Sequence, residues 1–198
     1  MSRLRKPKGV CGKAMTAMYQ EQNRRELVLE RLLASHETWF DVYRDYEFDG
    51  RVFPGYAEFH SHGEQYVLVK RAKLWEVDAF EYLFFTTTDT LHEAELEDLV
   101  AFMKTHAIQK VKPEPNHMTS YLSLVIIANN ADKDVKRLVR KTHFRKNFAL
   151  GIRGWADLRL ALIDLSDDSV TTNPQGEEMR ETLKANLVLS DSSTAQEN

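Results

Sequence analysis

The sequence predicts a single α/β (α+β) domain in which one mixed sheet is flanked by helices. Of its 198 residues, 42% are hydrophobic and 29% are charged, which suffices for one core and excludes a chain disordered throughout. Segments with a helical repeat of apolar residues alternate with strand-like segments, and no linker rich in Pro, Gly or Ser divides them. The predicted order is α-βββ-α-β-α-β-β-α, and the three consecutive strands are expected to form an antiparallel meander.

The first element is predicted to be a helix over residues 14–40. Its apolar positions recur at i, i+3, i+4, i+7 and i+11, a spacing that places them on one helical face. These positions are Leu29, Leu32, Leu33, His36 and Phe40. The dipeptide of Asp49 and Gly50 is a turn signal and predicts that the chain reverses after the helix.

Three strand-like segments follow, at residues 52–61, 65–73 and 80–88. They are rich in aromatic, β-branched and Thr residues, a composition that favours strands. Residues 61–64 predict a hairpin turn between the first two segments, because Gly63 can supply a positive φ. Together the segments predict the N-terminal meander.

A second helix is predicted to begin at residues 90–93. Thr90 and Glu93 have the spacing of a capping box, in which the Thr side chain caps the helix and the Glu side chain reaches back. The apolar stripe of this helix consists of Leu96, Leu99, Val100, Met103 and Ala107.

An almost unbroken apolar run covers residues 121–128. Such a run is typical of a strand that is covered on both faces, so we predict that it is the central strand of the sheet. Asp132 then opens a helix that is expected to reach about residue 141.

Two further strands are predicted over residues 144–153 and 156–165. Asn173 followed by Pro174 is a helix-start signal, with Asn as the cap and Pro at the first position. The last helix is expected to end near residue 189.

The expected domain limits are a disordered basic leader over residues 1–13, a globular domain over residues 14–189 and a disordered tail over residues 190–198. A single cysteine, Cys11, allows no intramolecular disulfide, which favours a reducing, cytoplasmic location. The net charge of −3 gives no overall bias toward nucleic acid or anionic lipid. No apolar stretch approaches the ~20 residues of a membrane helix, and we expect no membrane partner.

Glu58, His60 and His62 stand two residues apart along a predicted strand. Alternation would place all three on one face, and a carboxylate with two imidazoles is a ligand set for zinc or iron. The hairpin turn predicted at residues 61–64 would move His62 off that face. We therefore favour a solvated strand face and expect no bound metal or cofactor.

Asp157 and Arg159 share a face with Trp155 in an otherwise apolar strand, and Arg153 lies just upstream. Charges that are partly buried there should be paired. One interpretation is a structural ion pair. The other is a binding site that holds a carboxylate or phosphate through the guanidinium group.

Seven cations lie within residues 133–146, against two nearby acids, Asp132 and Asp134. Lys136, Arg137 and Arg140 are placed by helical spacing on an outer basic face. This face is either simply solvated or docks an anionic partner, whose phosphates such a face can neutralise.

Several short blocks resemble a family of uncharacterised bacterial proteins, chiefly from Gram-positive bacteria. The resemblance spans about residues 29–182 and implies a cytoplasmic bacterial setting with no assigned activity. The blocks are Tyr-Ala-Glu-Phe-His at 56–60, Gln-Tyr-Val-Leu-Val-Lys at 65–70, Ala72, Trp75, Glu81, Tyr82, Gly-Ile-Arg-Gly-Trp at 151–155, Arg159, Thr172, Asn173 and Gly176.

The element order also resembles that of restriction-endonuclease-like folds. Those nucleases place an acid on one strand and an acid-x-Lys motif on the next, which implies metal-dependent hydrolysis. This chain departs from the motif: Leu68 stands two residues before Lys70, and Leu83 stands two residues after Glu81.

No complete catalytic constellation can be assembled from the sequence, and no phosphate-binding, nucleophile-elbow or zinc-protease motif is present. We therefore predict a non-catalytic binding or regulatory domain rather than an enzyme. The alternative is a metal-dependent nuclease or hydrolase with a degenerate site. Convergence of Glu58, Glu81 and Lys70 around one cleft would favour that alternative.

Overall fold

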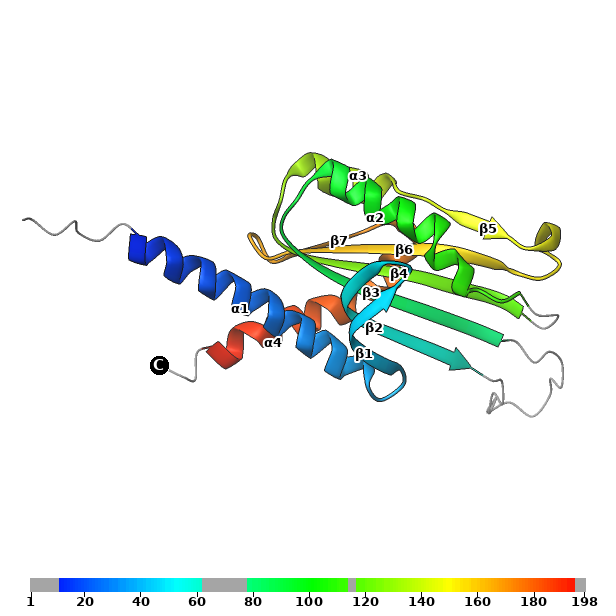
Figure 1. The fold of residues 1–198 in the computed structure, drawn as a ribbon, viewed down its shortest axis with the longest axis horizontal. Coiled ribbons are helices and arrows are strands. Elements are labelled where there is room, and N and C mark those ends of the chain that lie inside the picture. Colours follow the sequence, from blue (N-terminus) through cyan, green and yellow to red (C-terminus); the bar gives the residue numbers. More distant parts are fainter. Residues whose placement is uncertain (1–10, 62–77, 114–116, 195–198) are drawn as a thin grey trace, which may run out of the picture.

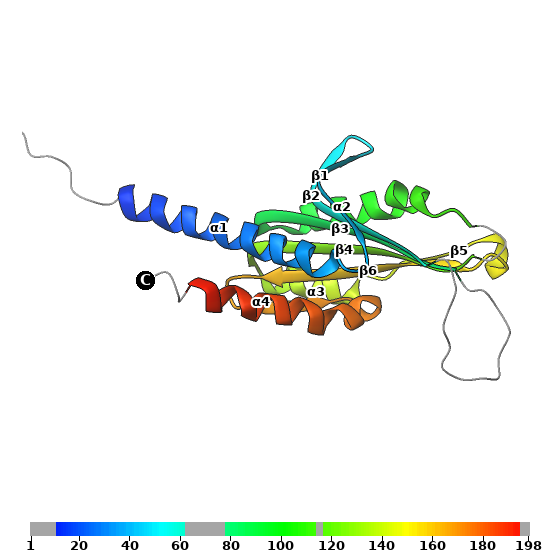
Figure 2. The same ribbon diagram turned by 90° about the horizontal axis from the view of Figure 1, so that it is seen from below.

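The computed structural model describes residues 11–61, 78–113 and 117–194, and its ribbon is shown in Figure 1. Two long helices, α1 (Cys11–His36) and α4 (Arg180–Thr194), lie antiparallel on one face of a mixed sheet, as Figure 2 shows from a second direction. Helices α2 (Glu93–Thr105) and α3 (Lys133–Lys141) cover the other face. The predicted mixed sheet flanked by helices is therefore confirmed.

The described part of the chain contributes seven strands to one open sheet. The first three strands pair antiparallel, and the next two pairings are parallel. The order across the sheet is β1 (Asp41–Phe48), β2 (Arg51–Ser61), β3 (Asp78–Leu91), β4 (His117–Ala131), β6 (Trp155–Asp164) and β5 (Arg145–Asn147), and β7 (Ser169–Thr172) also pairs with β6.

Strand β4 is central, as its apolar sequence predicted. It pairs with β3 along one edge and with β6 along the other. Val125 packs in the core beneath α1 and α4, whereas Ile126 packs in the core beneath α2 and α3. Both faces of β4 are thus covered, which explains why its sequence shows no alternation.

The N-terminal meander is present, but it begins one strand earlier than predicted. β1 and β2 are joined by a hairpin at Asp49 and Gly50, where the turn signal was recognised. β1 was missed because most of its side chains are exposed and half of them are charged, which weakens the apolar alternation of a strand. The predicted strand at residues 65–73 lies outside the described residues, as does all of the predicted hairpin turn beyond Ser61.

The predicted capping box does not form. Thr90 and Leu91 belong to β3, where they pair with Asn130 and Ala131 of β4. Helix α2 consequently begins at Glu93, with His92 at the N-cap position and no side-chain hydrogen bond there. A long parallel pairing therefore overrides a local capping signal.

Two local signals in the second half of the chain were correct. The Asp132 side chain accepts a hydrogen bond from the Val135 amide at the start of α3, and the Asn173 side chain accepts one from the Gly176 amide. The element after Asn173 begins as a 3-10 helix, η3 (Pro174–Met179), before α4 continues to Thr194. The strand predicted over residues 144–153 shortens to β5, followed by the 3-10 turn η2 (Ala149–Gly151).

None of the helices in the described ranges has the length and apolar character needed to cross a membrane.

Candidate functional site

A cleft of about 260 Å³ opens on the sheet face that carries α1 and α4. It lies where α1 ends and α4 begins, so the sheet forms its floor and the two helices form its walls. The floor and walls combine apolar and polar side chains. They are His36, Glu81, Leu83, Val125, Arg159, Glu178, Met179, Thr182 and Leu183.

The polar floor comes from three adjacent strands. In the ladder, Ser123 of β4 lies opposite Arg159 of β6 and opposite Leu83 of β3, two residues after Glu81. Strand alternation therefore turns the side chains of Glu81, Ser123 and Arg159 to the same face. The Ser123 hydroxyl donates to a Glu81 carboxylate oxygen at 2.5 Å, and Arg159 Nη1 lies 3.5 Å from that oxygen.

Arg159 is the most deeply placed charge of the cleft, with a side chain that is only 10% exposed. Its guanidinium carbon lies 3.3 Å from the centroid of the Tyr121 ring. Nη2 donates to the carboxylate of Glu178 at 2.9 Å, while Nε has no hydrogen-bond partner among the described residues. The guanidinium is therefore held between an inner acid, Glu81, and an outer acid, Glu178.

The two acids differ sharply in exposure. The Glu81 side chain is 17% exposed, whereas that of Glu178 is 80% exposed. Glu81 is fixed by Ser123, but Glu178 reaches Arg159 from solvent. Releasing Glu178 would cost that side chain little, because it is exposed and returns to water, while Arg159 keeps Glu81 as a partner.

Asn173 positions the segment that carries Glu178. It fills a gap at the outer edge of β6, between the stretches paired with β5 and β7. Its side-chain amide accepts from the Leu160 amide and donates to the Leu158 carbonyl, both at 2.9 Å, as a neighbouring strand would. Gly176 then packs so closely on β6 that a Cβ would lie 2.8 Å from the Leu160 carbonyl oxygen. These contacts hold η3 and Glu178 over Arg159.

His36 lines the cleft from the end of α1. Its Nδ1 lies 2.7 Å from the Leu32 carbonyl oxygen, which can only accept, so Nδ1 carries the hydrogen. The ring packs edge-on against Phe40 and Phe85. In the neutral imidazole, Nε2 is then a hydrogen-bond acceptor. The two aromatic contacts hold the ring in place.

Asp157 and Arg159 are both buried and paired, but with different partners. Asp157 receives two hydrogen bonds from Arg145, at 2.7 and 2.6 Å. Arg153 is exposed on the loop before β6, where its backbone carbonyl bonds to the His117 ring. Of the three residues predicted to form this site, only Arg159 therefore faces the cleft.

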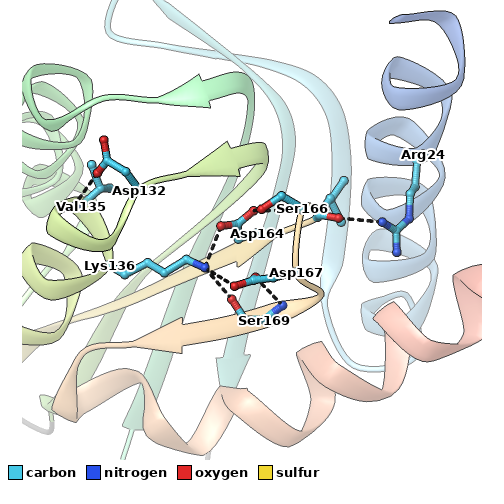
Figure 3. A network of polar contacts seen from close by, with 9 residues as sticks. Arg24, Asp132, Val135, Lys136, Asp164, Ser166, Asp167 and Ser169 are labelled. Atoms are coloured by element: carbon cyan, nitrogen blue, oxygen red, sulfur yellow. Dashed lines mark hydrogen bonds and ion pairs between the residues drawn. The ribbon is translucent and has the colours of Figure 1, made fainter. Parts of the chain in front are cut away.

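The predicted basic face is divided by a structural ion-pair network (Figure 3). Lys136 Nζ lies 2.7 Å from carboxylate oxygens of both Asp164 and Asp167, and its side chain is 12% exposed. These contacts tie α3 to the turn between β6 and β7. Arg137 and Arg140 remain on the exposed side, where Arg137 pairs with Asp134.

The metal and nuclease candidates do not come together. Glu58 lies opposite Tyr82 in the β2–β3 ladder and Glu81 lies opposite Phe59, so the two acids point to opposite faces of the sheet. The side chain of His60 and the whole of His62 and Lys70 lie outside the described part of the structure. Within that part, no group of three or more His, Cys, Asp or Glu residues could hold a metal ion.

Glu58 instead belongs to a polar cluster beneath α2. It accepts a 2.5 Å hydrogen bond from the Tyr56 hydroxyl and lies 3.6 Å from Lys110 Nζ. Burial, and then the nearby Glu58 charge, raises the pKa of Tyr82 to about 12. Burial and the bond to Glu58 raise the pKa of Tyr56 as well. Both phenols therefore stay neutral, and we interpret the cluster as part of the structural core.

Sequence reasoning missed His36, Ser123, Glu178 and Thr182 as cleft residues. Glu178 meets Arg159 across 19 positions of chain, a separation that matches no helical or strand repeat. The strand ladder that brings Ser123 beside Glu81 joins residues 42 positions apart. Strand register identifies Ser123, and the placement of α1, η3 and α4 over the sheet identifies the other three.

Comparison with known proteins gives a family but no activity. The family model described as "Domain of unknown function (DUF8052)" matches residues 24–185, which is most of the chain. The searches of curated proteins and of solved structures found no match. The matched residues include every residue that lines the cleft.

Proposed function

The chain belongs to the DUF8052 family, and we propose that it is a non-catalytic binding or regulatory protein whose cleft receives the carboxylate of a small molecule at Arg159. The single cysteine supports a cytoplasmic location for this role.

One observation carries the proposal: the buried guanidinium of Arg159 already binds the carboxylate of a solvent-exposed side chain. Glu178 is 80% exposed and nevertheless bonds Nη2 at 2.9 Å. Its carboxylate occupies the position that the carboxylate of a ligand would take. A ligand could displace Glu178 at little cost, because that side chain can return to water.

The rest of the cleft suits a ligand with an apolar body. Leu83, Val125 and Leu183 are buried side chains of its floor and wall, and Met179 is partly buried beside them. Small-molecule sites typically combine such apolar lining with few polar groups that fix orientation. Ser123 fixes Glu81, and Glu81 holds the Arg159 guanidinium in place. The guanidinium can then fix the orientation of the ligand carboxylate.

Binding is tested by titrating the purified chain with hexanoate and following amide shifts by NMR. Removing the internal competitor in Glu178→Gln should raise the affinity about fivefold, the equivalent of about 1 kcal/mol for a pair whose acid is exposed. Arg159→Lys keeps the charge but loses the planar fork, so it should lower the affinity about tenfold or more. Glu181→Gln, an exposed acid on α4 whose pair is with Lys184, is the matched control.

The outcome that contradicts the proposal is equal or absent binding of hexanoate by the wild type and by Glu178→Gln, with both folded by circular dichroism. A second titration with inorganic phosphate separates the two anions. Tighter binding of phosphate than of hexanoate would refute the carboxylate assignment.

A further inference from the structure

The loop that joins β5 to β6 presents apolar side chains to solvent. Leu150 is 99% exposed and Ile152 is 83% exposed, and Met118 at the start of β4 is 46% exposed beside the loop. Large apolar residues this exposed and this close together commonly mark an interaction site. We call residues 148–154 the apolar loop.

The apolar loop is a defined structure. Its ends are tied by a hydrogen bond from the Phe148 amide to the Gly154 carbonyl at 3.0 Å and by one from the Arg153 amide to the Phe148 carbonyl at 3.2 Å. Gly154 is packed directly against the Met118 backbone. The loop is thus anchored to the end of the central strand.

Two residues of the loop hold a backbone conformation that disfavours side chains. Ala149 has a φ of 47° and Leu150 has a φ of 57°. The left-handed region is unfavourable for residues with a Cβ. This conformation holds the Leu150 side chain out in solvent, where it gains no burial in return.

The charges of the chain segment that carries the loop have one sign. The chain from Phe144 to Ala156 contains no acidic residue. Lys146 just before the loop and Arg153 within it are exposed. A third cation, Arg145, is already neutralised by Asp157. The loop thus combines apolar side chains with nearby cations. This combination is complementary to a surface with an anionic outer layer and an apolar layer below it.

We propose that the apolar loop docks on an anionic lipid surface, with Leu150 and Ile152 inserted at the boundary of headgroups and acyl chains and Lys146 and Arg153 on the phosphates. Interfacial segments combine apolar insertion and basic contacts in this way. The coil of η2 lies near one end of the molecule, far from the first turns of α1 (Figures 1 and 2).

A lipid surface fits better than a protein groove. The side chains of Leu150 and Ile152 are almost fully exposed, so a partner must surround both of them. A bilayer does this with no shaped pocket, and its headgroups lie just outside its apolar layer. This proposal departs from the sequence expectation of no membrane partner, because the exposure of the loop is invisible in the sequence.

The test is cosedimentation of the full chain with vesicles. The wild type should bind vesicles of equimolar phosphatidylcholine and phosphatidylserine, and much less those of phosphatidylcholine alone. The double variant Leu150→Ser/Ile152→Ser should lose about tenfold or more of the partitioning. Lys146→Gln/Arg153→Gln should lose a similar factor and should abolish the dependence on phosphatidylserine.

Two control variants separate location from composition. Val52→Ser removes a 60% exposed apolar side chain from β2, and Arg137→Gln/Arg140→Gln removes two exposed cations from α3. Both should bind vesicles like the wild type. The proposal is refuted if the wild type does not bind anionic vesicles or if the loop and control variants bind alike. It is also refuted if sedimentation without lipid shows that the loop instead joins two copies of the chain.

Discussion

Gly154 and Gly176 are glycines because the backbone of another strand lies where a Cβ would be. At Gly154 the nearest atom would be the Met118 carbonyl oxygen, only 2.1 Å away, and φ is 72°. At Gly176 it would be the Leu160 carbonyl oxygen. Both glycines belong to the blocks that carry the sequence resemblance. At these two positions the resemblance therefore reports on how the strands pack, and not on chemistry.

Replacing Gly154 by Ala should destabilise the protein strongly. The change combines the cost of a left-handed φ with a collision against backbone that cannot move aside, and together these should cost about 3 kcal/mol or more. Gly50→Ala is the matched control, since its φ is 77° but nothing lies within 4 Å of the added Cβ. That variant should cost about 1 kcal/mol. Urea denaturation measures both, and equal losses would show that the contact with Met118 is unimportant.

The sequence predicted which charged residues of β6 are buried better than it predicted the residues that pair with them. The sequence identified Arg159 and Asp157 as partly buried charges that need pairing, because they interrupt an apolar strand. It could not name Glu81, Glu178 or Arg145 as the partners. Those contacts depend on strand register and on the placement of η3, which no local pattern encodes.

At the scale of elements, helix α3 shows how a periodic pattern can misassign one residue. Spacing placed Lys136, Arg137 and Arg140 on a common outer face. Lys136 lies instead at the border of that face, where the turn between β6 and β7 covers it with Asp164 and Asp167. Arg24 of α1 reaches the same turn through the Leu165 carbonyl at 2.8 Å, so the network connects three elements (Figure 3).

Lys136→Met should therefore destabilise the fold, whereas Arg137→Met should not. Removing Lys136 leaves the Asp164 carboxylate, which is 1% exposed, without its cation. Breaking a buried pair costs about 3–5 kcal/mol, and the lower end applies because Lys136 is partly exposed. Arg137 is 66% exposed, so its replacement should change stability by no more than about 0.5 kcal/mol. Thermal denaturation of both variants would contradict this assignment if they melted together.

The same network predicts a loss of stability in acid. The hydrogen bond from Lys136, and then that from Ser169, lowers the pKa of Asp167 below its usual 3.8. The unfolded chain therefore takes up this proton first as the pH falls. The stabilisation is complete above about pH 4 and is lost as the pH falls through the lowered pKa.

Urea denaturation at a series of acidic pH values measures this dependence. The slope of unfolding free energy against pH should be shallower in Asp167→Asn than in the wild type below pH ~4. Lys136→Met should remove the larger share of this part of the slope, because the cation is gone and only the hydrogen bonds from Ser169 still lower the pKa. An unchanged slope in both variants would exclude this ion pair as a source of acid sensitivity.

Across the whole molecule, β4 separates two cores. One lies between the sheet and α2 with α3, and the other lies between the sheet and α1 with α4. The sequence predicted this arrangement because the run at residues 121–128 is apolar on both faces. It missed β1 at the far edge because most side chains of this edge strand are exposed and half of them are charged. Burial thus leaves a pattern in the sequence, whereas pairing at an exposed edge leaves almost none.

Amide hydrogen exchange should be slowest in β4 and faster in strands farther from it. The amides of Val125, Ile126 and Ile127 lie in a strand that is paired on both sides and covered on both faces, so they should exchange only when the whole domain unfolds. Among the described strands, β1 pairs with β2 alone, and most of its residues are exposed. Amides near Tyr43 should therefore exchange through local opening, at rates that do not respond to destabilising variants such as Lys136→Met. The central amides should respond to that variant in full. Exchange at Ile126 as fast as at Tyr43 would show that β4 is not the centre of the cooperative unit.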